Sequence, residues 1–466
     1  MTFNSQYVAK ENIFYVFFIL FSSFHFFSIY FHSVLLVDDL AKMYQIFELK
    51  EDPLAHFTFI HRFLDTEIMT SRLILGFITG SLIYISQFCS DLYFLGNGIF
   101  YFSILIIFHT LKRLFEVEMS IFISLLYSLL FIGSFIQYSP IMLNSSVSTI
   151  LYCISLGYIL KSNTTSGLAY SMLFFFFSLL SYKIFAPLII LNIFFIRGPR
   201  ARVTYFLGSI ILILLYRRAL EPLLFVNYYK RDAIENLFEI DRLKSLLVLG
   251  GKLLTRDFII TFFKSVRAIQ YYSFLDYLYC ILSSLLIFLL IYRSNLEYKV
   301  KLVLLIGGLG IFVFSGYIPS LVGFEIRNLG ALRIFFSIFL MGILLYSTRT
   351  LSSLFRKSLL LLNLSSISIK NAWIYASAFN DKLFSDIFKE GGNSSRGSII
   401  IDYDIYEVVK NDSHLILREP IFYRSYESNY LVLKQGQNPI HIKVYNKASE
   451  IPAPLPPPII SYEKSI

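Results

Sequence analysis

Apolar blocks of about twenty residues recur along the first three quarters of the chain, separated by polar or charged segments. A helix of roughly 20 apolar residues is long enough to cross the hydrocarbon core of a bilayer. The pattern predicts an all-α polytopic membrane protein with about ten transmembrane helices in residues 1–346. The blocks run over approximately 13–34, 73–90, 92–111, 119–139, 141–160, 168–196, 203–226, 274–292, 302–319 and 329–346.

One of these blocks is interrupted in its middle. Residues 168–196 contain Tyr182 and Lys183 and, shortly after them, Pro187. Proline removes a backbone donor and bends or ends a helix. We expect either one long kinked helix or two partial passes here.

The composition changes after residue 346. Residues 347–466 are richer in charged and polar side chains, and Gly391-Gly392 would end a surface helix over Asn371–Glu390. Short runs of β-prone residues follow that helix. We expect a small hydrophilic α+β domain outside the membrane. The β-prone runs are 398–409, 415–417, 430–433 and 440–445.

The overall composition excludes a water-soluble globular enzyme. Hydrophobic residues make up 56% of the chain and charged residues only 15%, and the mean hydropathy is +0.65. The net charge of +10 fits Lys and Arg that flank spans and meet membrane lipids, rather than a nucleic-acid partner. The three cysteines are far apart, no two histidines are three or four positions apart, and no nucleotide-binding loop occurs. The sequence therefore predicts neither a metal site nor a cofactor.

Basic residues also predict the orientation, because Lys and Arg resist translocation across the membrane. The densest short basic loop extends from Arg197 to Arg202, and a second lies around Arg293 to Lys301. Placing both loops inside puts the N-terminus inside and the loop 35–72 outside.

The strongest candidate for chemistry is the pair Asp38 and Asp39, directly after the first apolar block. Two adjacent carboxylates at the edge of a membrane helix repel each other and are partly desolvated, conditions that suit a general base. An acidic cap for a following interfacial helix explains the pair equally well.

The loop after this pair is about thirty residues long and rich in ionisable groups among aromatic residues. Arg62 and Arg72 are among its cations. Such a segment is typical of interfacial helices with a polar face toward an aqueous cavity, although most of its charges need only anchor the fold.

These features together resemble the GT-C superfamily of membrane glycosyltransferases, and within it they are most similar to the bacterial serotype-converting O-antigen glucosyltransferases. The resemblance implies a polyprenyl-phosphate-linked sugar as donor and transfer on the external side of the membrane. It depends on Val37-Asp38-Asp39, the stretch from His61-Arg62-Phe63 to Thr70-Ser71-Arg72, Ser181-Tyr182-Lys183, and the stretch Arg327 to Arg333.

Departure of a polyprenyl phosphate builds negative charge that nearby cations would stabilise. Arg327 and Arg333 flank the start of the last predicted span. An unpaired guanidinium inside a span costs roughly 2.5–3.5 kcal/mol, so Arg333 needs a partner, which can be a lipid phosphate, Glu325 or water reached by snorkelling. Lys183, preceded by Tyr182, can contact phosphate or sugar hydroxyls, or satisfy a kinked backbone.

The sequence thus predicts a membrane hexosyltransferase that inverts the anomeric carbon. Asp38 or Asp39 is the expected catalytic base, and Arg62, Arg72, Tyr182, Lys183, Arg327 and Arg333 are the expected substrate-binding residues. The expected acceptor is a lipid-linked or lipopolysaccharide glycan such as O-antigen, and the expected location is a bacterial inner membrane with the site facing the periplasm. The alternatives are an O-antigen polymerase and a flippase or transporter for lipid-linked oligosaccharides.

Overall fold

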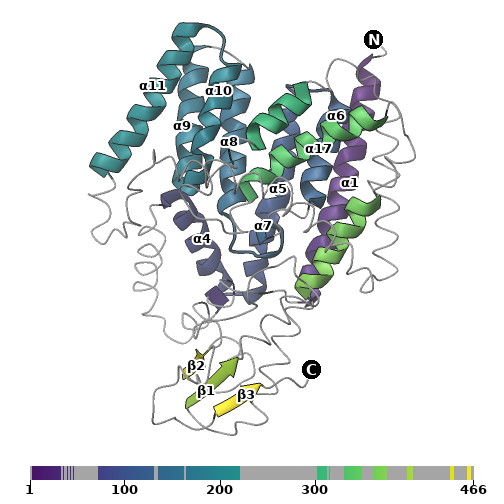
Figure 1. The fold of residues 1–466 in the computed structure, drawn as a ribbon, viewed down its shortest axis with the longest axis vertical. Coiled ribbons are helices and arrows are strands. Elements are labelled where there is room, and N and C mark those ends of the chain that lie inside the picture. The colour runs from purple at the N-terminus through teal and green to yellow at the C-terminus, as the bar shows by residue number, and fades with distance from the viewer. Residues whose placement is uncertain are drawn as a thin grey trace, which may run out of the picture.

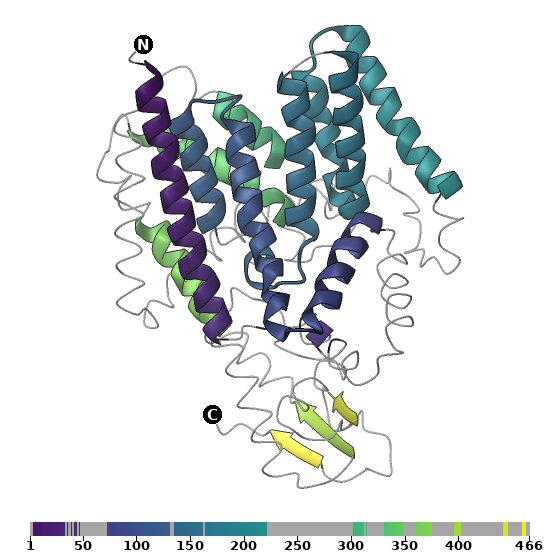
Figure 2. The ribbon, with the colours of Figure 1, turned by 180° about the vertical axis from the view of Figure 1, so that it is seen from behind.

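The computed structural model is built almost entirely from helices (Figures 1 and 2). The description that follows covers the residues whose positions are defined, and everything said below to be absent is absent from these residues only. They are 3–32, 72–130, 135–161, 164–220, 302–311, 330–348, 360–374, 396–401, 441–445 and 459–462, with residues 35, 39, 42, 43, 46 and 314.

Most helices begin and end close to the limits of the apolar blocks. The helices of the first half are α1 (Phe3–His32), α4 (Leu73–Ser86), the 3-10 helix η1 (Ser90–Phe94), α5 (Leu95–Leu111), α6 (Val117–Leu129), α7 (Phe135–Tyr138) and α8 (Asn144–Lys161). Then come α9 (Thr165–Ser181), the 3-10 helix η2 (Lys183–Leu188), α10 (Ile189–Phe195), α11 (Pro199–Leu215) and the π-helical turn η3 (Tyr216–Leu220). Further along lie a helix over Leu302–Ile311, α17 (Arg333–Thr348) and a helix over 360–374.

The helices form two groups that meet along α5 and α8. Helices α8 to α11 stand side by side in one group, while α1, α6 and α17 lie on the other side of α5 (Figures 1 and 2). One hydrophobic core runs through both groups. Segment 135–143, which contains α7, sits between α5 and α8.

The interruption expected in block 168–196 is present. Helix α9 ends at Ser181, Tyr182 has an extended backbone (φ −156°, ψ 106°), and η2 with Pro187 inside it leads into α10. Pro187 cannot donate a helical hydrogen bond. The block therefore forms two helices joined by a short 3-10 segment, and the carbonyl and side chain of Tyr182 lie at the joint.

Small polar side chains hold α8 to its neighbours. Ser148 Oγ donates to the carbonyl of Ser178, and Ser178 Oγ donates to the carbonyl of Ser148, both at 3.0 Å. Asn192 of α10 donates to the hydroxyl of Tyr205 of α11 at 2.8 Å. In lipid, packing apolar surfaces together gives little hydrophobic free energy. Interhelical hydrogen bonds and close packing at small residues therefore commonly stabilise contacts between membrane helices.

Two helices are long and apolar enough to cross a membrane, Gln6–Phe31 within α1 and Ser90–Leu111, which comprises η1 and α5. The shorter apolar helices have 10–17 residues. Block 203–226 is described only in part, and block 274–292 lies outside the described residues. The structure thus confirms a helical protein with two helices of spanning length, and the count of about ten spans remains a prediction.

The helix over 360–374 extends the helical core beyond residue 346, where the sequence predicts the hydrophilic domain to begin. Trp373 stacks on Tyr138 with 5.6 Å between ring centroids, and both side chains are buried. The predicted helix Asn371–Glu390 overlaps this helix only at its first four residues, and residues 375–390 are outside the described part.

Three short parallel strands are described near the C-terminus. They form one sheet in the order β2-β1-β3, and in Figure 1 they lie beyond the end of the bundle where α1 ends. Three strands alone do not establish the α+β domain expected for residues 347–466, which remains a prediction. The strands are β1 (Arg396–Ile401), β2 (His441–Tyr445) and β3 (Ile459–Tyr462).

Candidate active site at Asp39

Of the eight residues predicted to form the site, five are described. Asp38, Arg62 and Arg327 lie outside the described residues. The five described residues are Asp39, Arg72, Tyr182, Lys183 and Arg333, and they fall into three separate places.

Asp39 is a buried carboxylate whose hydrogen-bond donors in the described part of the chain include Tyr93, Ser139 and Ile141. It is only 1% exposed. The hydroxyl of Tyr93 donates to Oδ1 at 2.7 Å, and the backbone N–H of Ile141 donates to the same oxygen at 3.1 Å. The hydroxyl of Ser139 donates to Oδ2 at 2.6 Å. Both carboxylate oxygens are therefore fixed in direction by neutral donors, which compensate for the cost of removing the charge from water.

The donors come from two elements that the bundle brings to the end of α1. Tyr93 lies in η1, and Ser139 and Ile141 follow α7. A close approach between α5 and this segment sets their spacing, because a Cβ placed on Gly96 would overlap the carbonyl oxygen of Pro140. Only glycine at position 96 lets the backbone of segment 139–141 come this near to α5.

Sequence reasoning did not find Tyr93, Ser139 or Ile141. They are separated from Asp39 by 54, 100 and 102 positions. No local pattern marks such distant partners. One local feature of the sequence points to this region. The pair Gly96-Asn97 places a glycine and an amide side chain at the start of an otherwise apolar helix.

Two polar side chains of α5, which follows Tyr93 in the chain, lack hydrogen-bond partners within the described part of the chain. Asn97 lies four residues after Tyr93, in the first turn of α5. Neither its Oδ1 nor its Nδ2 has a hydrogen-bond partner there, although the residue is only 1% exposed. The hydroxyl of Tyr101, one turn further, is also buried and unpartnered among these residues. Buried amides and hydroxyls normally find a partner in protein, water or ligand.

Arg333 occupies a different place, deep in the bundle. Its exposure is 0%, and its guanidinium donates to the carbonyls of Tyr127 (2.5 Å) and Ser128 (3.0 Å) and to Oε1 of Gln137 (2.9 Å). It also lies over the ring of Phe100, with Cζ 5.2 Å from the centroid. Protein carbonyls and an amide thus serve as partners for this arginine, which does not snorkel to solvent. Glu325, the acidic partner considered from the sequence, lies outside the described residues.

One short segment binds both buried charges. Gln137 accepts from Arg333, while Ser139 and the N–H of Ile141 donate to Asp39. The acidic and basic side chains are therefore held by residues within five positions of each other. A displacement of segment 137–141 would disturb both.

The third place is the joint between α9 and α10. The guanidinium of Arg72, at the start of α4, lies 5.4 Å from the ring centroid of Tyr182, and Lys183 is the next residue. The structure thus brings Arg72 to Tyr182, two residues that the sequence predicted to bind substrate, and Lys183 follows Tyr182 in the chain. The stacking of Arg72 on the Tyr182 ring fixes one cation at the break in the helix.

This cationic joint and Asp39 are at different ends of α4. Arg72 precedes the first residue of α4, whereas Tyr93 belongs to η1, which follows the last turn. A helix of 14 residues is about 21 Å long. The joint and the carboxylate therefore do not enclose a single sugar ring in this structure.

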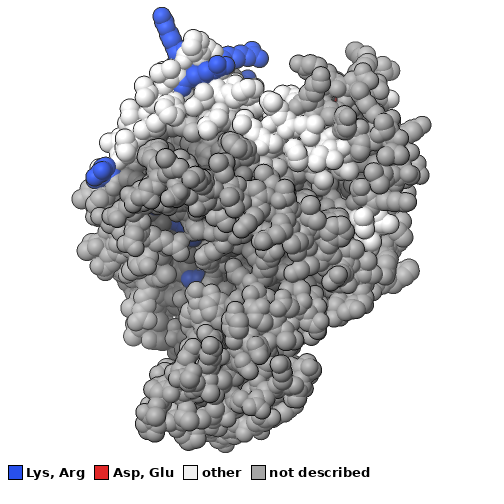
Figure 3. Space-filling model, in the orientation of Figure 1, with Lys and Arg blue, Asp and Glu red and all other residues white. Residues whose placement is uncertain are grey.

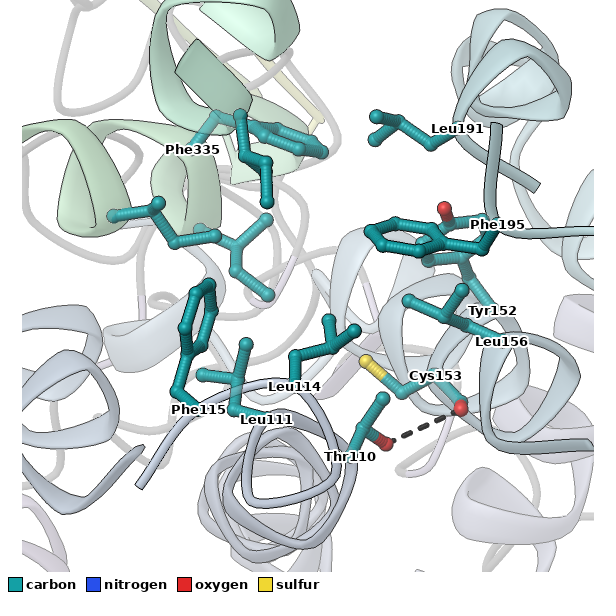
Figure 4. A pocket seen from close by; sticks show the side chains of 13 residues that line it. Thr110, Leu111, Leu114, Phe115, Tyr152, Cys153, Leu156, Leu191, Phe195 and Phe335 are labelled. Carbon is teal, nitrogen blue, oxygen red and sulfur yellow. Dashed lines mark hydrogen bonds between the residues drawn. The ribbon is translucent and has the colours of Figure 1, made fainter. Parts of the chain in front are cut away.

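An apolar cavity of about 40 Å³ lies where the two helix groups meet, and its walls come from α5, α8, α10, α17 and Leu302–Ile311 (Figure 4). The hydroxyl of Thr110 is turned away to the carbonyl of Cys153 at 3.2 Å. The rest of the lining is mostly hydrocarbon, which offers sugar hydroxyls few partners. None of the predicted site residues lines this cavity.

Among the described residues no group of three or more His, Cys, Asp or Glu side chains could hold a metal ion. Comparison with known proteins adds no assignment, because no family model, curated protein or solved structure matches the chain. The argument for function therefore depends on the residues themselves.

Proposed function

We propose that the protein is an inverting membrane glycosyltransferase in which Asp39 is the catalytic base. It moves a hexose, glucose by the resemblance noted above, from a polyprenyl-phosphate donor to a cell-surface glycan such as O-antigen. The full proposal includes about ten spans, a C-terminal domain outside the membrane, and a site at the periplasmic face of a bacterial inner membrane.

The observation that carries the proposal is the oriented carboxylate at the end of the first long apolar helix. Asp39 is buried, yet its two oxygens are held by donors from two other segments, η1 and 139–141. A general base must be fixed within hydrogen-bond reach of the proton that it takes, in surroundings that exclude bulk water. A structural cap for a local helix needs no donors from such distant parts of the chain.

The proposed reaction is a single displacement. The acceptor hydroxyl exchanges with the Ser139 hydroxyl at Oδ2 of Asp39, and the carboxylate takes its proton as the acceptor oxygen bonds to the anomeric carbon. The bond from that carbon to the phosphate oxygen breaks, and the polyprenyl phosphate leaves with the bonding electron pair. Attack from the face opposite the leaving group inverts the anomeric configuration.

Two buried polar side chains of α5 suit a polyhydroxylated ligand. Asn97 offers two N–H donors and a carbonyl acceptor, and Tyr101 offers a hydroxyl, all without a partner in the described part of the chain. Neutral groups of this kind recognise sugar hydroxyls by hydrogen bonding. We therefore assign Asn97 and Tyr101 to the binding of a sugar rather than of a phosphate.

The leaving phosphate is assigned to Arg72 and Lys183. Both are partly exposed; Arg72 lies over the Tyr182 ring, and Lys183 follows Tyr182 in the chain. Arg333 is not assigned this role in the proposal, because its guanidinium is fully buried among protein acceptors. Since α4 separates the joint from Asp39 by about 21 Å along its axis, the proposal requires the two to approach when the donor binds.

The test uses membranes that contain the full-length chain, a radiolabelled polyprenyl-phosphate hexose and a lipopolysaccharide acceptor. Label that moves to the acceptor one residue at a time supports the proposal. Label that appears only as extended repeat units indicates a polymerase. Label that crosses sealed vesicles without joining the acceptor indicates a flippase, and either of these results overturns the proposal.

A further inference from the structure

The group α8 to α11 carries positive charge without any acidic counterpart. Residues 144–215 contain no Asp or Glu. Lys161 closes α8, and Arg197, Arg200 and Arg202 surround the turn from α10 to α11, so four cations gather at one end of the group. All four are exposed. Figure 3 shows Lys and Arg side chains projecting from this end amid uncharged surface.

Two other cations at the same end of the bundle have acidic partners, and Arg113 donates to the carbonyl of Gly157. Lys10 of α1 pairs with Glu118 of α6, and Lys112 at the end of α5 pairs with Glu11 at 3.2 Å. In the α8–α11 group, Arg202 is tied down by a hydrogen bond from Nε to the carbonyl of Ile196 at 2.8 Å, which stabilises the turn. Lys161, Arg197 and Arg200 instead point out from a stretch of chain that has no carboxylate to offer.

A broad apolar face adjoins these cations. Helix α11 is 17 residues long, about 26 Å, and starts at the basic turn. Its outward large side chains are 41% to 57% exposed, which would be unfavourable in water but suits hydrocarbon. Helices α9 and α10 of the same group also carry exposed apolar residues. The α11 residues are Val203, Phe206, Leu207, Ile211, Leu214 and Leu215.

We propose that the basic end of the α8–α11 group binds the head groups of anionic phospholipids, with the apolar face of α11 against their acyl chains. Arg197 and Arg200 supply multiple N–H donors for phosphate oxygens, and Lys161 adds a further charge. A cluster of Lys and Arg directly beside an apolar helix face is the arrangement that anionic leaflets attract. An anionic lipid fits this surface better than a protein partner does, because the cations lie directly beside the exposed apolar face of α11.

The inference has a consequence for orientation. The N-terminus of α1 and the start of α11 lie at the same end of the bundle (Figures 1 and 2). If that end binds the anionic cytoplasmic leaflet, the far end of α1, and Asp39 beyond it, face the opposite leaflet. This inference shares with the proposed function only the premise that the chain resides in a membrane, and it does not need the transferase reaction.

The test measures lipid binding to the full-length protein in neutral detergent. Phosphatidylglycerol, phosphatidylcholine and inorganic phosphate are titrated separately, and the midpoint of thermal unfolding is followed. Arg197→Gln combined with Arg200→Gln removes two of the exposed charges. Arg200→Gln is also tested alone. Its matched control is Arg218→Gln, which removes one exposed charge from η3 at the other end of α11.

We expect phosphatidylglycerol to raise the unfolding midpoint of the wild type and of Arg218→Gln at lower lipid concentration than phosphatidylcholine does. The apparent affinity for phosphatidylglycerol should fall about fivefold for Arg200→Gln and roughly 25-fold for the double variant. Equal effects of the two lipids, an undiminished response of the double variant, or the same response to inorganic phosphate would overturn the inference. Transfer activity of the double variant is assayed in parallel, so that a failure of lipid binding is distinguished from a failure of the proposed reaction.

Discussion

Replacing Tyr93 by phenylalanine removes one oxygen atom and nothing else from the contacts around Asp39. The Tyr93 side chain is fully buried and its hydroxyl donates to Oδ1 at 2.7 Å. A hydrogen bond to a charged group contributes about 1.5–3 kcal/mol to stability. The free energy of unfolding of Tyr93→Phe should therefore fall by about that amount, which is roughly a 10- to 150-fold change in the unfolding equilibrium.

The same substitution in an Asp39→Asn background separates this bond from general loss of packing. Asparagine keeps the shape of the side chain but has no charge, so the remaining hydrogen bond contributes only about 0.5–1.5 kcal/mol. The cycle of single and double variants should give a coupling energy of about 1 kcal/mol or more between Tyr93 and Asp39. Tyr170→Phe is the control, because the Tyr170 side chain is 53% exposed and its loss of a hydroxyl should cost under about 0.5 kcal/mol.

The assay is a reversible titration of the purified variants from neutral detergent into denaturing mixed micelles, followed by circular dichroism. The reasoning fails if Tyr93→Phe unfolds at the same point as Tyr170→Phe. It fails equally if Tyr93→Phe costs the same in the wild-type and Asp39→Asn backgrounds, because the hydroxyl would then make no bond that depends on the charge.

Four other substitutions test the packing of the bundle, with Gly98→Ala as a control. Gly96→Ala should lower the free energy of unfolding by about 1–3 kcal/mol, because its Cβ would overlap a backbone carbonyl. Gly98→Ala, with open space around it, should leave the melting temperature unchanged or raise it. Equal unfolding midpoints for the two variants would contradict the close approach. Arg333→Met should lower the free energy of unfolding by at least about 2 kcal/mol, because it leaves three buried acceptors without a donor. A stable variant with a raised KM for the donor would instead show that Arg333 holds the phosphate. Ser148→Ala and Ser178→Ala should each cost about 0.6 kcal/mol, measured in the same micelle titration, and costs near zero would mean that the reciprocal bonds of α8 and α9 add nothing.

The sequence predicted the positions of several helices well, although the predicted block 119–139 is not one helix, because α6 ends at Leu129 and Leu130 is extended. The block 92–111 corresponds to η1 and α5, which end at Leu111, and the break at Tyr182 falls where Pro187 and Lys183 had indicated it. Hydropathy suffices here because burial in a bundle and burial in lipid select the same side chains.

The segment 360–374 shows where hydropathy is insufficient. Ser365, Ser366 and Ser368 alternate with apolar residues in this helix, and the sequence placed the segment in the hydrophilic C-terminal domain. The structure buries all three serines beside Trp373. Serine hydroxyls can bond to the helix backbone itself, so a buried helix tolerates them although they lower its mean hydropathy.

The sequence could predict individual residues of the candidate site but not the partners that hold them. Asp39 stood out because an acidic residue after a long apolar run is unusual. Its partners Tyr93 and Ser139 are ordinary residues of apolar helices and turns, and only the packing of α5 against segment 139–141 brings them to the carboxylate. Arg333 was recognised as a residue in need of a partner, but the carbonyls that serve it lie far away along the chain, at separations of 206 and 205 positions.

The most direct measurement of the central claim compares single-turnover transfer of a labelled hexose by the wild type and by Asp39→Asn, with the micelle titration run on both to show that the variant is folded. If Asp39 takes the acceptor proton, the rate of transfer falls by about 10²- to 10⁴-fold while the variant keeps its helical structure. A folded Asp39→Asn protein that transfers the sugar at the wild-type rate would show that this carboxylate holds the end of α1 in place and takes no part in the reaction.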